Sequence, residues 1–209
     1  MFDFKLLFLL TPPLLLALTV HEFSHGFAAY LLGDPTPKTA GRLSLNPLKH
    51  LDPLGTLVLF MTQAIGWARP VPINPNYFKN PWRDMAIVSV AGPLSNLLLA
   101  IILGIVFNII YKFFPPGPFT LPLAKMSYLG VKLNIGLAIF NLLPIPPLDG
   151  SKILAKFLPW SLRSQYLKSE MIGFLVILLL SVTGILGKVL YPILTLFSNF
   201  VLYYTGLIF

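Results

Sequence analysis

Long apolar runs alternate with short polar segments along the whole chain. The runs at about residues 4–32, 85–111 and 127–143 are long enough to cross a bilayer as helices, for which about 17 to 25 apolar residues suffice. A further run, residues 55–66, is too short to cross and indicates a re-entrant or interfacial piece. The pattern therefore predicts three full spans in the first two thirds of the chain.

The segments outside these runs differ in character. Residues 36–53 carry charged side chains and are expected to form an extramembrane loop. Residues 67–81 contain four prolines, which forbid a helix and favour extended chain. This segment either offers its backbone to an extended peptide or serves only as a covering loop. Residues 151–170 predict a basic interfacial helix, and residues 171–209 predict a helical hairpin that turns near Gly184 to Lys188.

Composition excludes a soluble domain. The 209 residues are 56% hydrophobic and only 11% charged, and the mean hydropathy is +0.80. We therefore expect an all-α fold: a polytopic membrane helical bundle with about five full spans, a re-entrant segment and short extended β-like loops. Residues 1–209 are expected to form a single integral-membrane domain, with the functional core at about 4–152 and C-terminal helices at about 153–209.

The net charge of +8 is spread over the loops between the apolar runs. Because the basic residues form no stripe, we expect lipid headgroups as their counter-charge and no nucleic-acid partner. If residues 55–66 re-enter, ten basic residues share one side of the membrane and two lie opposite, which predicts an outside N-terminus. Separately, we expect a multi-pass protein of a prokaryotic plasma membrane. The ten are Lys38, Arg42, Lys49, Arg69, Lys79, Arg83, Lys152, Lys156, Arg163 and Lys168, and the two are Lys112 and Lys125.

The first apolar run contains His21-Glu22-Phe23-Ser24-His25, an H-E-x-x-H sequence. Residues four apart share one face of a helix, so His21 and His25 can bind one metal ion while Glu22 reaches its open position. This is the pattern of zinc proteases, in which the glutamate takes a proton from the zinc-bound water. A chance match is the alternative, but three ionisable residues within one turn of a membrane helix are costly and indicate function.

A catalytic zinc needs a third protein ligand, and the chain offers few candidates. Cysteine is absent, and the remaining histidine is His50, in a predicted extramembrane loop. Asp3, Asp34 and Asp84 lie at the ends of spans, where capping or solvated roles are ordinary. Asp149 follows the third span at a depth that matches His21, among apolar residues. Asp149 is therefore the expected ligand, with a helix-capping role for Asp149, or His50 as ligand, as the alternatives.

Two further motifs lie in apolar surroundings. The run Ala91-Gly92-Pro93-Leu94-Ser95-Asn96 either lets another helix approach closely or places Asn96 in the site. The prolines in the run from Asn141 to Gly150 must break the third span while the chain is still apolar. Broken backbone at membrane depth is tolerated only where it is buried in protein or lines a cavity.

Together with His21-Glu22-Phe23-Ser24-His25, these motifs resemble the site-2 protease family of intramembrane zinc metalloproteases. The resemblance covers most of the chain to about Lys152, and the runs Asn46 to Thr56 and Gly66 to Pro75 are similar to those of the small prokaryotic branch. It implies one zinc ion per chain, bound by His21, His25 and Asp149 and served by Glu22. It also implies that Asn96 and Asn141 line the site and contact the substrate backbone or the developing oxyanion.

The resemblance further implies an endopeptidase that cuts transmembrane segments of other membrane proteins, with its site opening toward the cytoplasm. The chain departs from larger members of the family because it shows no PDZ module and no CBS pair, so selection or regulation through such domains is not expected. Two other classes remain open. A non-proteolytic metal-binding membrane protein or transporter would explain the histidines but leaves Glu22 without a task, and a silent binding scaffold would not need the intact motif. The substrate and the oligomeric state are not readable from the sequence.

Overall fold

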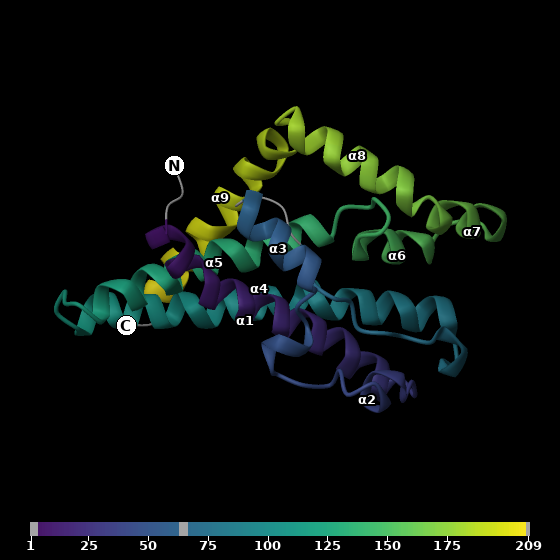
Figure 1. Ribbon diagram of the computed structural model, residues 1–209, viewed down its shortest axis with the longest axis horizontal. Coiled ribbons are helices and arrows are strands. Elements are labelled where there is room, and N and C mark those ends of the chain that lie inside the picture. The colour runs from purple at the N-terminus through teal and green to yellow at the C-terminus, as the bar shows by residue number, and fades with distance from the viewer. Residues whose placement is uncertain (1–3, 63–66, 208–209) are drawn as a thin grey trace.

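The computed structural model describes residues 4–62 and 67–207 and is all-helical over these ranges (Figure 1). The membrane bundle expected from the sequence is thereby confirmed. The helices in order are α1 (Phe4–Leu31), α2 (Thr36–Thr39), α3 (Pro53–Thr62), α4 (Pro81–Phe113), α5 (Thr120–Asn141), α6 (Asp149–Ala155), α7 (Trp160–Lys168), α8 (Glu170–Val182) and α9 (Ile185–Gly206).

The centre of the molecule is the three-helix group α1, α4 and α5, which lie side by side in Figure 1. Small residues allow the close approach: a Cβ added at Gly130 of α5 would stand 3.2 Å from Pro13 of α1. Ala100, Val131 and Ile135 are fully buried between α4 and α5. Van der Waals contact between small residues is the usual way that helices associate where lipid removes the hydrophobic driving force.

Four helices are long and apolar enough to cross a membrane: α1, α4, α5 and α9. A fifth crossing results if α7 and α8, which meet at a bend of 59°, are taken together. The expected number of spans is therefore met, although two spans start earlier than the hydropathy indicates. Helix α4 begins at Pro81, because Asn80 caps it through a 3.3 Å hydrogen bond from the Arg83 N–H and Pro81 takes the first helical position.

The segments on either side of the short run at residues 55–66 lie next to each other. Helix α3 forms its first part, and residues 63–66 lie outside the described part of the chain. On either side, Leu51 forms an antiparallel bridge with Ala68, and the N–H of Arg69 donates to the carbonyl of His50 at 2.8 Å. This pairing of the two flanks agrees with the re-entrant prediction.

The C-terminal part turns where the sequence predicts, but its two helices do not fold back as a hairpin. Gly184, with φ +73°, makes the turn between α8 and α9. Thr205 and Gly206, at the end of α9, contact Asn108 and Lys112, near the end of α4, so α9 runs in the same direction as α4 (Figure 1).

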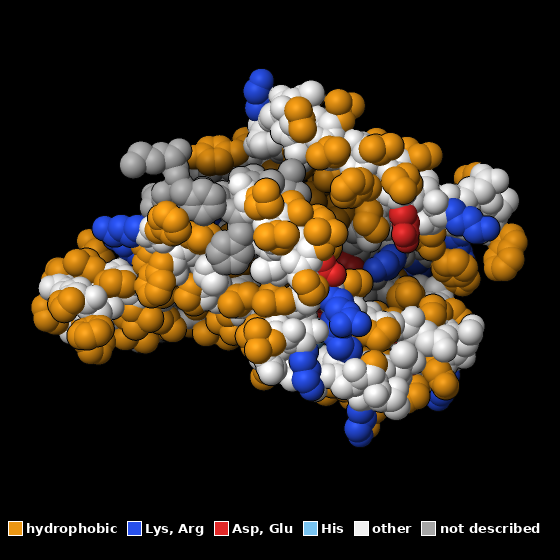
Figure 2. All heavy atoms as spheres, in the orientation of Figure 1, with side chains coloured by type: hydrophobic (Ala, Val, Ile, Leu, Met, Phe, Trp, Pro, Cys, Tyr) orange, Lys and Arg blue, Asp and Glu red, His pale blue; other side chains and the backbone are white. Residues whose placement is uncertain are grey.

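The predicted interfacial helix is divided in two. The basic stretch 151–170 forms two helices: α6 ends at Ala155, and Pro159, which a continuous helix would not tolerate, supplies the N-cap position of α7. Figure 2 shows that basic side chains gather over α2, α6, α7 and the nearby loops, whereas apolar side chains cover most of the long helices.

Candidate metal centre

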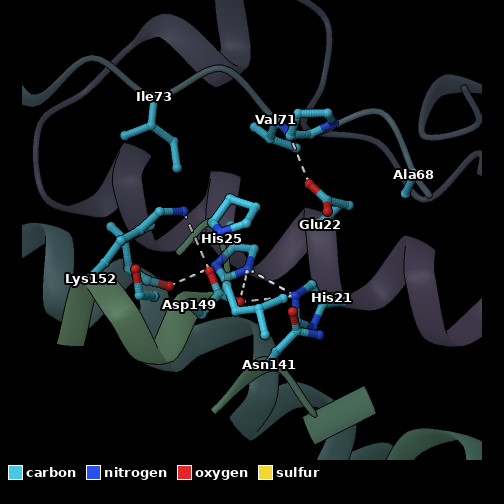
Figure 3. Close-up of a pocket in the computed structure, with 14 residues that line it drawn as sticks. His21, Glu22, His25, Ala68, Val71, Ile73, Asn141, Asp149 and Lys152 are labelled. Carbon is cyan, nitrogen blue, oxygen red and sulfur yellow. Dashed lines mark hydrogen bonds and ion pairs between the residues drawn. The ribbon is translucent and has the colours of Figure 1, made fainter. Parts of the chain in front are cut away.

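Three metal-ligand side chains meet between the central helices (Figure 3). His21 and His25 lie one turn apart on α1, and Asp149 is the first residue of α6. All three are buried, with exposed fractions of 6–7%. Gly92 of α4 makes room for both rings, since a Cβ there would stand 2.6 Å from Cε1 of His21 and closer still to His25.

The three ligand atoms form a nearly equilateral triangle. Nε2 of His21 lies 3.0 Å from Nε2 of His25, and Oδ2 of Asp149 lies 3.3 Å from the first and 3.1 Å from the second. A tetrahedral zinc ion with bonds of about 2.0–2.1 Å separates its ligand atoms by about 3.3 Å. The set His21, His25 and Asp149 therefore fits a zinc ion that keeps one open position.

The hydrogen bond on the far side of His25 identifies its tautomer. Nδ1 lies 2.7 Å from the carbonyl oxygen of Val88, which can only accept, so Nδ1 carries the proton. The neutral ring then turns an unprotonated Nε2 toward His21 and Asp149, as a metal ligand requires. Nδ1 of His21 is buried with no hydrogen-bond partner among the described residues. A shared cation would satisfy the facing Nε2 of His25 and Oδ2 of Asp149.

The loop between α5 and α6 carries Asp149 to the histidines. A Cβ at Gly150 would overlap the carbonyl of Leu142, so only glycine lets α6 begin this close to the end of α5. The hydroxyl of Tyr166, on α7, donates to the carbonyl of Pro144 at 2.6 Å and holds the loop from outside. Pro147 and Leu148 of this loop line a pocket beside the histidines, so the broken helix lines a cavity, as the proline run predicts.

Glu22 follows His21 on α1 and is half-buried. Its Oε2 accepts a 2.9 Å hydrogen bond from the N–H of Val71, in the extended segment after α3. Arg42 supports this segment by donating to the carbonyl of Arg69. Burial and the charge of Arg69 lower the pKa of Arg42, and the Glu22 carboxylate opposes that shift. Glu22 thus lies beside the metal site, against the extended segment that Arg42 supports.

A pocket of about 310 Å³ contains the whole arrangement. One wall carries the metal-ligand group and Glu22, and the other carries the extended segment after α3. Asn141 and Lys152 supply its remaining long polar side chains. Its lining residues are His21, Glu22, His25, Ala68, Pro70, Val71, Ile73, Val88, Ser89, Asn141, Pro147, Leu148, Asp149 and Lys152. The pocket thus brings the extended segment after α3 opposite the three ligand atoms.

The alternatives for the third ligand have other contacts. Nε2 of His50 lies 2.7 Å from the carbonyl of Ser44, so it is a donor there, and His50 is not in the metal-ligand group. Asp149 is not the N-cap of α6, a position held by Leu148. Asp34 accepts from the N–H groups of Thr36 and Asn74 at 2.9 and 2.7 Å.

The remaining acids named from the sequence also lie apart from the metal-ligand group. Asp84 accepts from the N–H of Asn80 and the side chain of Arg83 at 3.0 and 2.8 Å. It therefore has the capping role that a span end favours. Asp3 lies outside the described residues.

The two asparagines expected to line the site lie in different places. Asn141 does line the pocket, and its Nδ2 donates to the carbonyl of Leu137 at 2.9 Å. Asn96 does not line the pocket. It is fully buried in α4, one turn beyond Gly92, and its amide has no hydrogen-bond partner among the described residues. A contact with substrate stays a prediction for both.

The residue pattern does not reveal three residues that contact the site. Val88 acts through its carbonyl and Val71 through its N–H, and no side-chain pattern can reveal a backbone contact. Lys152 counts in the sequence only as one basic residue among many. Its spacing of three residues from Asp149 is the signal that could have identified it, because residues three apart on a helix are neighbours.

Fold and site together define a class: a multi-pass membrane protein with a buried histidine, histidine and aspartate metal site and an adjacent glutamate. The profile of Peptidase family M50 matches residues 119–183. "Putative zinc metalloprotease YwhC" of Bacillus subtilis is 43% identical over 183 residues, which cover 87% of this chain and 83% of that protein. The chain belongs to peptidase family M50, the site-2 protease family of zinc metalloproteases.

Other relatives agree with this assignment. "Putative zinc metalloprotease Rip2" of Mycolicibacterium smegmatis is 33% identical over 193 residues, covering 89% of this chain and 71% of that protein. A shorter match joins 67 residues at 43% identity to "Putative zinc metalloprotease MJ0611" of Methanocaldococcus jannaschii, covering 32% of this chain and 31% of that protein. No solved structure matches the chain. Since these relatives are prokaryotic, the protein belongs in a prokaryotic membrane.

Proposed function

We propose that this protein is an intramembrane zinc endopeptidase that cleaves transmembrane segments of other membrane proteins, with one zinc ion per chain. The observation that carries the proposal is the triangle of ligand atoms from His21, His25 and Asp149 with Glu22 at its side. A metal site without hydrolysis would not need a carboxylate that faces the same pocket and takes no part in the ligand group.

Each side chain has a distinct role in the proposed reaction. His21, His25 and Asp149 hold the zinc ion, which when bound supplies a Lewis acid that polarises the scissile carbonyl and acidifies water. Glu22 accepts a proton from the attacking water as the new C–O bond forms. It then gives that proton to the nitrogen of the leaving amine as the C–N bond breaks. Asn141, which lines the pocket, is proposed to contact the substrate backbone.

The extended segment after α3 is the proposed docking strand. Ala68, Pro70, Val71 and Ile73 line the pocket, and Arg42 and His50 hold the segment from behind. A transmembrane helix hides its peptide bonds in its own hydrogen bonds, so it must unwind before it is cut. Backbone groups on a fixed strand can replace some of those hydrogen bonds, as in other cases of strand addition.

The Glu22→Gln variant tests the proposal. General acid–base catalysis contributes about 10²–10⁴-fold, so this variant is expected to lose at least about 100-fold in cleavage rate while it binds zinc like the parent. Membrane proteins that accumulate uncut in cells carrying the variant supply the substrate, which is then assayed with purified enzyme. Glu170→Gln, which changes an exposed glutamate at the start of α8, is the control. Undiminished cleavage by Glu22→Gln would refute the proposed mechanism.

Zinc content separates the proposal from the rival classes. Purified parent protein is expected to bind one equivalent of zinc, and Asp149→Ala is expected to lose most of it together with cleavage. Zinc binding by the parent without any proteolysis would favour a metal-binding protein or transporter. Absence of both would favour a binding scaffold.

A further inference from the structure

The two oxygens of Asp149 have different neighbours. Oδ2 faces His21 and His25, whereas Oδ1 lies 3.6 Å from Nζ of Lys152. Lys152 stands three residues further along α6, and its side chain, about one-third exposed, reaches along the pocket wall toward the carboxylate (Figure 3). Among the described residues that line the pocket, Lys152 is the one lysine or arginine.

Building on the proposed metal centre, we propose that Lys152 is a positioning residue that holds Asp149 to the metal through one oxygen. A carboxylate can bind zinc with one oxygen or with both. If both oxygens bound, Asp149 would occupy the position that a catalytic zinc keeps open for water and substrate. The ammonium group of Lys152 attracts Oδ1 and leaves Oδ2 alone in the ligand triangle.

Burial makes this partner necessary. Asp149 is 6% exposed, and an ionised carboxylate has two oxygens that both need donors or cations. Oδ2 contacts the two histidines. Among the described residues, Lys152 is the side chain that lies beside Oδ1. The nearby amide of Asn141 is engaged with its own helix, at Leu137. Replacing the residue that contacts a metal ligand typically lowers metal affinity or activity by about 10–100-fold.

The chain supplies a matched control. Lys156 lies one turn beyond Lys152, with Nζ 5.3 Å from the centre of the Phe157 ring, and it does not line the pocket. Replacing either lysine by methionine removes one positive charge, keeps a similar chain length and leaves the helix propensity almost unchanged. A general effect of charge on the membrane surface would therefore appear in both variants, but an effect on Asp149 only in Lys152→Met.

The experiment measures the zinc dissociation constant of purified full-length protein by competition with a chelator. Lys152→Met is expected to weaken zinc binding by about 10–100-fold, Lys152→Arg to recover most of the loss, and Lys156→Met to match the parent. Cobalt(II) in place of zinc gives a second readout, because absorption in the visible weakens when a four-coordinate site becomes five-coordinate. Lys152→Met should show that weakening, and Lys152→Arg should not.

Two results overturn the role of Lys152: parent-like zinc affinity and cobalt spectrum in Lys152→Met, or a Lys152→Arg variant that is folded but no better than Lys152→Met. If Lys152→Met does not fold, Lys152→Gln, which also lacks the charge, takes its place, and a zinc affinity equal to that of Lys156→Met would overturn the role of Lys152. A parent protein that binds no zinc would refute the metal centre itself, which is a different failure.

Discussion

At the residue scale, the site depends on the absence of a side chain as much as on its ligands. Gly92 of α4 faces His21 and His25, and the space of its missing Cβ is filled by their rings. The sequence allows two interpretations of the run that contains Gly92 and Asn96: close helix approach or a place in the site. Gly92 lets α1 approach α4 closely, so the two rings have room to turn toward Asp149.

Gly92→Ala is therefore expected to displace one or both imidazoles. The new Cβ would lie within 2.6 Å of His21, so α4 must move or the rings must rotate away from Asp149. We expect at least a 10-fold loss of zinc affinity, of the size seen when the support of a metal ligand is removed. Gly187→Ala is the control, because a Cβ at Gly187 meets nothing within 4 Å. Equal zinc affinity of the two variants would show that Gly92 has no such role.

At the element scale, helices outside the central group hold the loop that carries Asp149. Tyr166 of α7 donates to Pro144, and Gly173 of α8 lies directly against the carbonyl of Pro146. Arg163 of α7 also stacks over the ring of Trp82, at the start of α4. Helices α7 and α8 therefore contact both the loop between α5 and α6 and the start of α4, although they supply none of the ligands.

Gly173→Ala is expected to push α8 away from this loop. Its Cβ would overlap backbone atoms of Pro146, which cannot move like the end of a side chain. Cleavage is expected to fall several-fold, with a smaller loss of zinc affinity than in Gly92→Ala, because the loop keeps its contacts with α5. Val182→Ala, on the exposed end of α8, should leave both quantities unchanged. Parent-like cleavage by Gly173→Ala would show that α8 does not support the site.

Helix α9 is joined to α4 by a polar contact inside the membrane. Nδ2 of Asn108 lies 2.9 Å from Oγ1 of Thr205 and 3.1 Å from the carbonyl of Leu202. Such contacts contribute about 0.6 kcal/mol on average and up to about 1.7 kcal/mol. We expect Asn108→Leu to lower the free energy of unfolding by about that amount in a detergent denaturation series, and Asn199→Leu, at an exposed position, to have no effect.

At the scale of the whole molecule, the bridge between Leu51 and Ala68 brings the basic loops before and after α3 together, and we expect both loops on one side of the membrane. This is the arrangement in which positive charge lies ten to two on the cytoplasmic side. The side of the membrane toward which the site opens therefore depends on whether residues 55–66 re-enter or cross the membrane.

The absence of cysteine allows a direct test of this topology with single introduced thiols. Thr39→Cys, Asn76→Cys and Ser164→Cys are expected to react with a membrane-impermeant reagent only from the cytoplasmic side, and Pro118→Cys only from outside. All four side chains are exposed. Labelling of Asn76→Cys from the outside together with Pro118→Cys would mean that residues 55–66 cross the membrane, and the re-entrant assignment would be wrong.

The sequence by itself determined the helical membrane fold, the approximate spans and the H-E-x-x-H turn, because these depend on local periodicity and on spacing along one helix. Elimination among few acids also singled out Asp149. Only the tertiary structure decided which groups complete the site: the carbonyl of Val88, the N–H of Val71 and the space at Gly92. Those contacts join segments far apart in the chain through backbone atoms and packing distances, which no residue pattern encodes.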